Sequence, residues 1–190
     1  MISFYGNTSG DSGGKSTIRY DESTNYIQVY KNGAWRDFMQ VMPQSLIPHL
    51  NSLYGDNGYV IFNDKVSYYW NGSKDVWKAF DGNTSSHGEY WGENQSNFWI
   101  GYLFNASHQI SNAIFYGGNY SSSDVFEVIV EITQDGSTWT SVGTFNQEYG
   151  DNAPKAVTIN KDVLGIRWRS PTTKTSGHNL FIYELEVYGN

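Results

Sequence analysis

Residues 126–137 read Phe-Glu-Val-Ile-Val-Glu-Ile-Thr-Gln-Asp-Gly-Ser and decide the fold of this chain. Apolar side chains occupy every second position from Phe126 to Ile132. The two glutamates of the run, Glu127 and Glu131, lie at positions between them. Because successive side chains of a strand point to opposite faces, this spacing predicts a β-strand with one buried and one solvated face. The Asp135-Gly136 pair that follows is typical of a tight turn. We therefore expect a half-buried strand of an antiparallel sheet.

The same alternation recurs in two later runs. In residues 164–170, the apolar Ile166 and Trp168 alternate with Arg167 and Arg169, and residues 181–187 alternate in a similar way. An aromatic content of 17%, with 20 glycines and 4 prolines, favours many short strands joined by tight turns. A length of 190 residues suits one ordinary domain with a smaller appendage. We predict an all-β fold in which two sheets pack as a sandwich.

The first 42 residues are predicted to form a separate β-meander. Three β-rich runs are present, at residues 17–20, 26–30 and 34–38. Asn32-Gly33 lies between the last two runs and is a strong hairpin signal. A sheet of this size buries too little apolar area to stand alone, so it should pack on the sandwich or on copies of itself. Residues 43–58 are expected to form a short helix and a linker, with Ser45 as cap and Gly55 as end, before a sandwich at residues 59–190.

Composition excludes several classes of function. The net charge of −7 and the lack of a Lys/Arg cluster argue against nucleic acid as a partner, because phosphate binding is dominated by cationic contacts. The absence of cysteine excludes a disulfide scaffold, a thiolate metal site and a cysteine nucleophile. No apolar stretch reaches the length of a membrane span, and the N-terminus lacks the features of a signal peptide. We expect no membrane insertion, and an extracellular location would require a route other than a signal peptide.

Several motifs occur in the order that is typical of one known family. They are Lys78-Ala79-Phe80-Asp81-Gly82-Asn83, Tyr90-Trp91, Phe98-Trp99-Ile100-Gly101-Tyr102, the runs at residues 126–139 and 166–169, and Tyr183-Glu184-Leu185-Glu186-Val187-Tyr188-Gly189. Together, over residues 60–190, they resemble the coagulation factor 5/8 type C domain, which is discoidin-like and galactose-binding-like. The resemblance implies a jelly-roll β-sandwich that binds a ligand, usually a glycan, and catalyses no reaction.

The resemblance also implies a structural calcium ion on the Asp-Gly loop. Its oxygen ligands would be the Asp81 side chain, the carbonyls near Phe80 and Asn83, Ser86 or a near neighbour, and Glu184 of the final strand. Calcium accepts about six to eight hard oxygens in flexible geometry, which carbonyl-rich loops supply. The alternative is that Asp81 only caps a turn and that Glu184 is a solvated strand residue.

Sugar-binding members of the family carry aromatic and polar residues on loops at one end of the sandwich. The matching loops here are residues 87–91, 117–121 and 176–181, with the candidate ligand-binding residues His87, Asn119, Tyr120, His178, Asn179 and Phe181. An aromatic ring stacks on the apolar face of a sugar, while polar side chains bind its hydroxyl groups. The sugar-binding arginine of the family has no counterpart in residues 117–124, which argues against galactose-type specificity. Alternatively, the histidines are ordinary loop residues, and Trp91 and Trp99 are expected in the core.

The N-terminal segment has a resemblance of its own. Val29-Tyr30-Lys31-Asn32-Gly33-Ala34-Trp35-Arg36, after a glycine-rich start, is similar to N-terminal segments of phage and prophage virion proteins. These expectations combine into a non-catalytic adhesion protein with a virion or extracellular location, which binds a host surface carbohydrate. It would oligomerise through its N-terminal segment and contact other virion or assembly proteins. Two alternatives stay open, namely a structural virion decoration protein whose loops contact protein, and a glycan-active enzyme.

Overall fold

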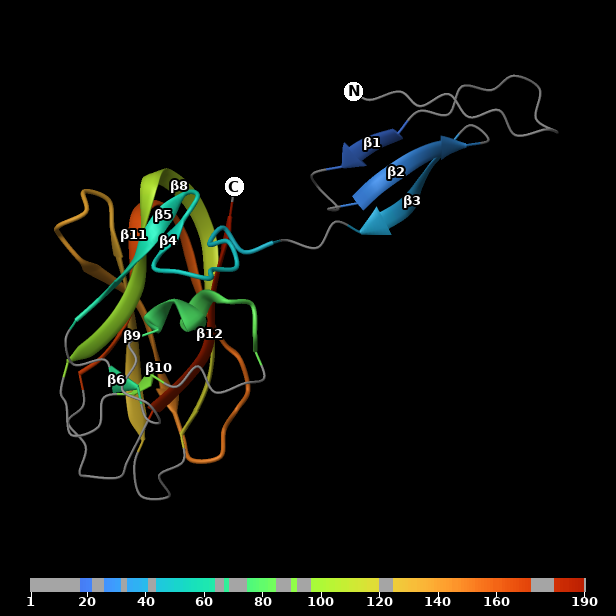
Figure 1. The fold of residues 1–190 in the computed structure, drawn as a ribbon. Helices are drawn as coiled ribbons and strands as arrows, with labels where there is room; N and C mark the ends of the chain where they lie inside the picture. The colour runs from blue at the N-terminus through green and yellow to red at the C-terminus, as the bar shows by residue number, and fades with distance from the viewer. Residues whose placement is uncertain are drawn as a thin grey trace. The chain divides into compact units, whose positions relative to one another are not determined.

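The structure is a computed structural model of the chain. It describes residues 18–21, 26–31, 34–40, 44–63, 67–68, 75–84, 90–91, 97–119, 125–171 and 180–189. The chain divides into two compact units, Met1–Gln44 and Ser45–Asn190 (Figure 1). Among the described residues, no helix is long and apolar enough to cross a membrane.

The first unit is the predicted three-stranded meander. Its strands are β1 (Ile18–Asp21), β2 (Tyr26–Lys31) and β3 (Ala34–Gln40), which pair antiparallel in the order β1-β2-β3. Lys31 pairs with Ala34, so two residues connect β2 and β3, as a short hairpin requires. The Asn32-Gly33 turn itself lies outside the described residues. Tyr30 and Trp35 lie opposite each other, with ring centroids 5.3 Å apart.

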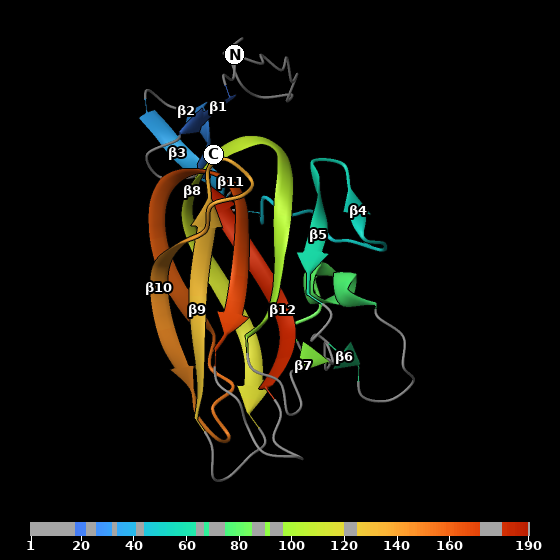
Figure 2. The same cartoon turned by 90° about the vertical axis from the view of Figure 1, so that its left-hand side faces the viewer.

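The second unit is a β-sandwich, as predicted (Figure 2). Its strands pair in the order β10-β9-β11-β8-β5-β4, and β12 also pairs with β8. These strands are β4 (Tyr54–Gly55), β5 (Gly58–Phe62), β8 (Phe98–Asn119), β9 (Phe126–Thr133), β10 (Thr140–Gln147), β11 (Lys155–Ser170) and β12 (Leu180–Gly189). The remaining described elements are the pair β6 (Ser67–Tyr68) and β7 (Tyr90–Trp91), and the 3-10 helix η1 (Val76–Phe80).

Two long strands contribute to both layers of the sandwich. Near Phe98 and Ser170, β8 and β11 pair in the layer that also holds β5, β9 and β10. Near Phe115 and Lys155, the same two strands pair in the layer that holds β12. The register between them shifts twice in the middle of β11, and such irregularities bend strands. The two layers are therefore continuous through β8 and β11 (Figure 2).

The sandwich has two distinct ends. At the turn end, β9 ends at Thr133 and β10 begins at Thr140. At the loop end, β8 ends at Asn119 and β12 begins at Leu180 (Figure 2). The connections from β8 to β9 and from β11 to β12 start or finish there. Two of the three predicted ligand loops therefore belong to the loop end.

The core lies between the two layers. Phe126 and Val130 are fully buried, which confirms the apolar face predicted for this run. Phe80, from η1, packs its ring against Tyr102 and Trp168, with centroids 6.0 and 6.5 Å apart. The expectation that Trp99 is a core residue is wrong, because its two neighbours in β8 point inward and alternation turns Trp99 outward. The side chain of Trp91 lies outside the described residues.

The prediction of a short helix after residue 43 is wrong. The described residues 44–53 contain no helical turn and lead directly into β4. Their N–H groups bind the sandwich instead, since Leu46 N and Leu50 N donate to carbonyls of β12 and η1 at 2.6 and 2.8 Å. Ser45, the expected helix cap, accepts a hydrogen bond from Val187 N at 3.1 Å. Docking also buries Ile47, so tertiary contacts outweigh local helix propensity and join this segment to the sandwich unit.

Candidate functional site

The Asp-Gly loop follows η1 and has the geometry of a capped turn. Gly82 has a φ of +85°, a left-handed conformation that favours glycine. The Asp81 Oδ1 atom accepts a hydrogen bond from Asn83 N at 2.9 Å. This contact matches the alternative reading of Asp81 as a turn cap, but it uses only one of the two carboxylate oxygens.

Glu184 of β12 lies beside this loop. Its side chain is only 2% exposed, and Oε2 accepts a hydrogen bond from Gly82 N at 3.0 Å. Burial raises the pKa of Glu184 to about 9, and the nearby carboxylates of Asp81 and Glu186 act in the same direction. The alternative that Glu184 is a solvated strand residue is therefore wrong. The structure brings Glu184 and the Asp81-Gly82 turn together although Gly82 and Glu184 are 102 residues apart in the sequence.

The donor set at this point fits a hard cation. A buried carboxyl group stays protonated when no positive charge lies near it. A cation bound beside it would favour the ionised carboxylate, which could then act as a ligand. The described part of the chain holds no group of three or more His, Cys, Asp and Glu side chains placed for a metal ion. A cation here would therefore need carbonyl or hydroxyl oxygens as well, which is the coordination that calcium accepts. The Phe80 side chain belongs to the core, so only its carbonyl could contribute, and Ser86 lies outside the described residues.

Asn119 does not lie on an exposed loop, contrary to expectation. It is the last residue of β8, is 1% exposed, and pairs with Leu180 of β12. Its Nδ2 atom donates to the Gln147 carbonyl at 3.2 Å, and its own carbonyl accepts from Gly150 N at 3.1 Å. The loop was expected to start at Gly117, but pairing with β12 extends β8 two residues further. This extension buries the side-chain amide of Asn119. Asn119 therefore positions the segment after β10.

The other predicted ligand residues are only partly described. Phe181 lies in β12, half-buried and opposite Gly118 of β8. His87, Tyr120, His178 and Asn179 lie outside the described residues and stay predictions.

Tyr149 is a further candidate at the loop end that sequence reasoning missed. Its side chain is 59% exposed, and its backbone forms a parallel bridge with Asn119. The backbone of Tyr149 therefore lies next to the residue from which the β8–β9 connection departs. The only signal in the sequence is an aromatic residue between Glu148 and Gly150, in a segment of turn residues.

A second charged cluster lies on the solvent face of β8, β9 and β11. Glu131 accepts hydrogen bonds from the Nε atoms of Arg167 and Arg169, at 2.6 and 3.1 Å. The Arg167 guanidinium also lies over two indole rings, 4.3 Å from the centroid of Trp139 and 5.1 Å from that of Trp99. These groups bind one another, so the cluster stabilises the sheet, and its two guanidinium groups and one carboxylate leave a net charge of +1.

The model of the F5/8 type C domain family matches residues 63–184. No curated protein sequence matches the chain. Among solved structures, the C-terminal domain of a chitobiase from Bacteroides fragilis is 21% identical, with a TM-score of 0.55 over 71% of this chain and 95% of that one.

Two further solved structures have the same fold. A carbohydrate-binding module from Clostridium perfringens, in complex with GalNAc-β-1,3-galactose, is 11% identical, with a TM-score of 0.55 over 70% of this chain and 96% of that one. Chitosan-binding module 2 from Paenibacillus sp. IK-5, in complex with chitotriose, is 23% identical, with a TM-score of 0.51 over 70% and 97% of the two chains. Since the family match extends over residues 63–184, more than half of the sequence, the chain belongs to the F5/8 type C domain family.

Proposed function

We propose that the sandwich unit binds carbohydrate at its loop end and catalyses no reaction. The observation that carries this proposal is the exposed side chain of Tyr149, whose backbone bridges to Asn119, where the β8–β9 connection departs. An exposed aromatic ring next to polar connections is the arrangement by which proteins hold sugars, since the ring covers an apolar sugar face. Family membership supports the same function, as do solved relatives of this fold that were obtained with GalNAc-β-1,3-galactose and chitotriose.

The ligand residues that we propose divide into two roles. Tyr120 and Tyr149 supply contact area, while His87, His178 and Asn179 bind hydroxyl groups. Asn119 and Phe181 support these residues from the strands, because both lie within the β8–β12 pairing.

A screen of the purified chain on a glycan array, with and without calcium, tests this function. Tyr149→Ala and Tyr120→Ala should each weaken binding to any glycan that is found by roughly five-fold, because an aromatic contact contributes about 1 kcal/mol. Tyr54→Ala is the matched control, since Tyr54 is 73% exposed but lies on the β4–β5 hairpin. Loss of binding in the control, with both other variants unaffected, would place the ligand elsewhere.

We also propose that a calcium ion binds beside Asp81 and Glu184, with the carbonyls near Phe80 and Asn83 and with Ser86. What supports it is the buried Glu184 carboxyl in contact with the Asp-Gly turn. When bound, calcium would supply positive charge that ties the Asp-Gly loop to β12.

The N-terminal unit is proposed to attach the sandwich to a larger assembly, such as a virion, through self-association. The support lies in its described strands, which form one three-stranded sheet. The side chains of Ile18, Ile27, Val29 and Trp35 are only half-buried there, and Tyr30 is 41% exposed. A single sheet layer with such side chains needs a second layer to bury them.

Light scattering tests the self-association. The full chain should be an oligomer, and residues 45–190 alone should form a folded monomer, because the core of the sandwich unit is formed by its own residues. A monomeric full chain would mean that the meander is not an assembly element.

A further inference from the structure

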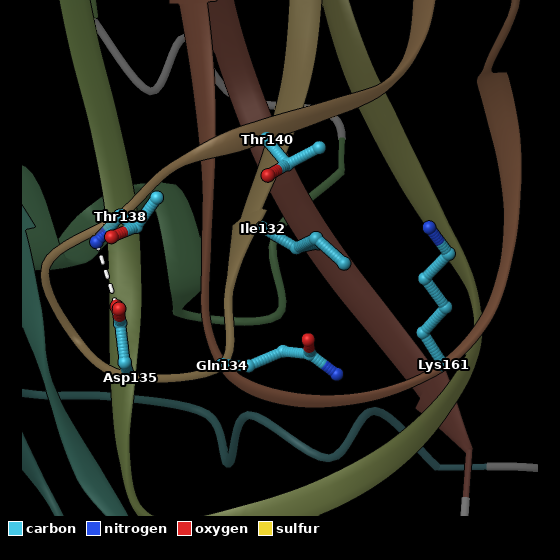
Figure 3. Close-up of a pocket in the computed structure, with 6 residues that line it drawn as sticks. All are labelled: Ile132, Gln134, Asp135, Thr138, Thr140 and Lys161. Carbon is cyan, nitrogen blue, oxygen red and sulfur yellow. Dashed lines mark hydrogen bonds between the residues drawn. The ribbon is translucent and has the colours of Figure 1, made fainter.

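A polar pocket lies at the turn end of the sandwich, away from the predicted ligand loops. Its volume is about 490 Å³, which falls within the roughly 300–1,000 Å³ range of small-molecule sites. Figure 3 shows Lys161 on one side of the hollow and the β9–β10 residues on the other. The lining residues are Ile132, Gln134, Asp135, Thr138, Thr140 and Lys161.

The wall that follows β9 is held by internal hydrogen bonds. The Asp135 Oδ1 atom accepts a hydrogen bond from Ser137 N at 2.8 Å. It accepts another from Thr138 N at 2.7 Å (Figure 3). It also accepts from the Thr133 hydroxyl at 3.0 Å. Gly136 provides the left-handed residue of this turn, with a φ of +79°. The turn is therefore ordered without a ligand, and binding there would require little rearrangement.

The opposite wall comes from an irregularity in β11. The pairing with β8 shifts between Thr158 and Lys161, and Asn160 has a left-handed φ of 51°. A bulge changes the direction of the side chains around it, which accounts for Lys161 facing the pocket. The Gln134 Nε2 atom donates to the Asp162 carbonyl at 3.1 Å and so connects the two walls.

The pocket retains groups that are available to a ligand. Lys161 makes no ion pair with a carboxylate in the part of the chain that the structure describes. The hydroxyl of Thr140 is both a donor and an acceptor, and the side-chain carbonyl of Gln134 is an acceptor, whereas the Thr138 hydroxyl already interacts with the Asp135 carboxylate. The formal charges of Lys161 and Asp135 cancel, so the lining presents mixed polar groups without net charge.

We propose that this pocket is a second ligand site, which takes a neutral, hydroxyl-rich ligand such as one sugar residue of a glycan. Sugar hydroxyls match the lining because each is both donor and acceptor, whereas a strongly charged ligand would meet one repulsive side chain. The site goes beyond the loop-end function proposed above and does not depend on it. A chain with a sugar site at each end of its sandwich can bridge two glycans or gain avidity from one surface.

The test is an NMR titration of the isotopically labelled full chain, with N-acetylgalactosamine and with chitotriose as probes. We expect saturable shifts at the amides of Gly136, Thr138 and Lys161 with at least one probe. Thr140→Val and Lys161→Met should each weaken that binding by about five-fold, the equivalent of one hydrogen bond. Both side chains are exposed, so neither change should lower the melting temperature. Thr144→Val is the matched control, because Thr144 is also exposed on β10 but does not line the pocket.

Two results would overturn the proposal. One is the absence of saturable shifts at the turn end with either probe. The other is that Thr140→Val, Lys161→Met and Thr144→Val all bind the probe at the turn end with equal affinity. Shifts confined to the amides of Tyr149 and Gly150 would support the loop-end function and reject the second site. Shifts confined to the turn end would support the second site and reject the loop-end function.

Discussion

Arg167→Ala is expected to lower the free energy of unfolding by about 3 kcal/mol, since it removes a charged hydrogen bond from a nearly buried carboxylate and a cation–π contact. Glu131 is 7% exposed and depends on Arg167 and Arg169 for its partners. The Trp139 and Trp99 rings lose the guanidinium between them. Urea unfolding measures the change.

Two comparisons make this experiment decisive. Lys161→Ala removes a cation without an ion pair in the described structure, and we expect it to change stability by less than about 0.5 kcal/mol. Arg167→Lys keeps the charge but not the planar guanidinium, so it should recover only part of the loss. If Arg167→Ala and Lys161→Ala have equal effects, the cluster does not stabilise the sheet.

The same cluster predicts how stability depends on pH. Burial raises the pKa of Glu131, but hydrogen bonds from Arg169 and Arg167 outweigh it, and the pKa lies below its ordinary value. The stabilisation is therefore present above the unfolded-state pKa of about 4.5 and is lost as pH falls through the lower folded-state pKa. Glu131→Gln should flatten this acid side of the stability curve, as measured by urea unfolding at several pH values.

Calcium is expected to raise the melting temperature of the chain, because an ion that binds only the folded state stabilises it by mass action. At a hundred times its dissociation constant, the increment is about 2.7 kcal/mol. Glu184→Gln should abolish it, since an amide lacks the charge of a carboxylate ligand. In chelator at neutral pH, parent and variant should melt at similar temperatures, because burial raises the pKa of Glu184 to about 9 and leaves it neutral, like glutamine.

Glu186→Gln is the matched control for this experiment. Glu186 lies two residues away on β12 and accepts a hydrogen bond from the Tyr188 hydroxyl at 2.7 Å, but it is outside the proposed ligand set. It should keep the calcium increment. A parent protein whose melting curve is the same in chelator and in millimolar calcium would rule the calcium site out.

Structural features that depend on residues close together in the sequence could be predicted from the sequence. The buried face of β9 follows from the alternation of apolar residues, and the Asp135-Gly136 turn follows from two residue types that favour such backbone. The meander was predictable for the same reason. The proximity of Glu184 and the Asp-Gly loop is different, since no local pattern relates these residues, and it was expected only from the family resemblance.

Features that depend on pairing between distant strands could not be predicted. Trp99, Trp139 and Arg167 come from three separate segments, and the β8–β11 register together with the β9–β10 connection brings both rings to the guanidinium. Asn119 is buried because β12 pairs with β8 up to that residue. Residues 44–53 lack a helix because their N–H groups find partners in elements more than 25 residues away along the chain.

Strands β8 and β11 run through both layers and so fix the offset of one layer relative to the other. They pair along their length, from Phe98 opposite Ser170 to Phe115 opposite Lys155. This offset does not depend on the segments that close the loop end. An insertion or deletion in residues 120–124 or 172–179 should therefore leave the layers in register. In evolutionary terms, the proposed recognition surface and the framework are separately mutable, so lineages could change the ligand while the fold stays constant.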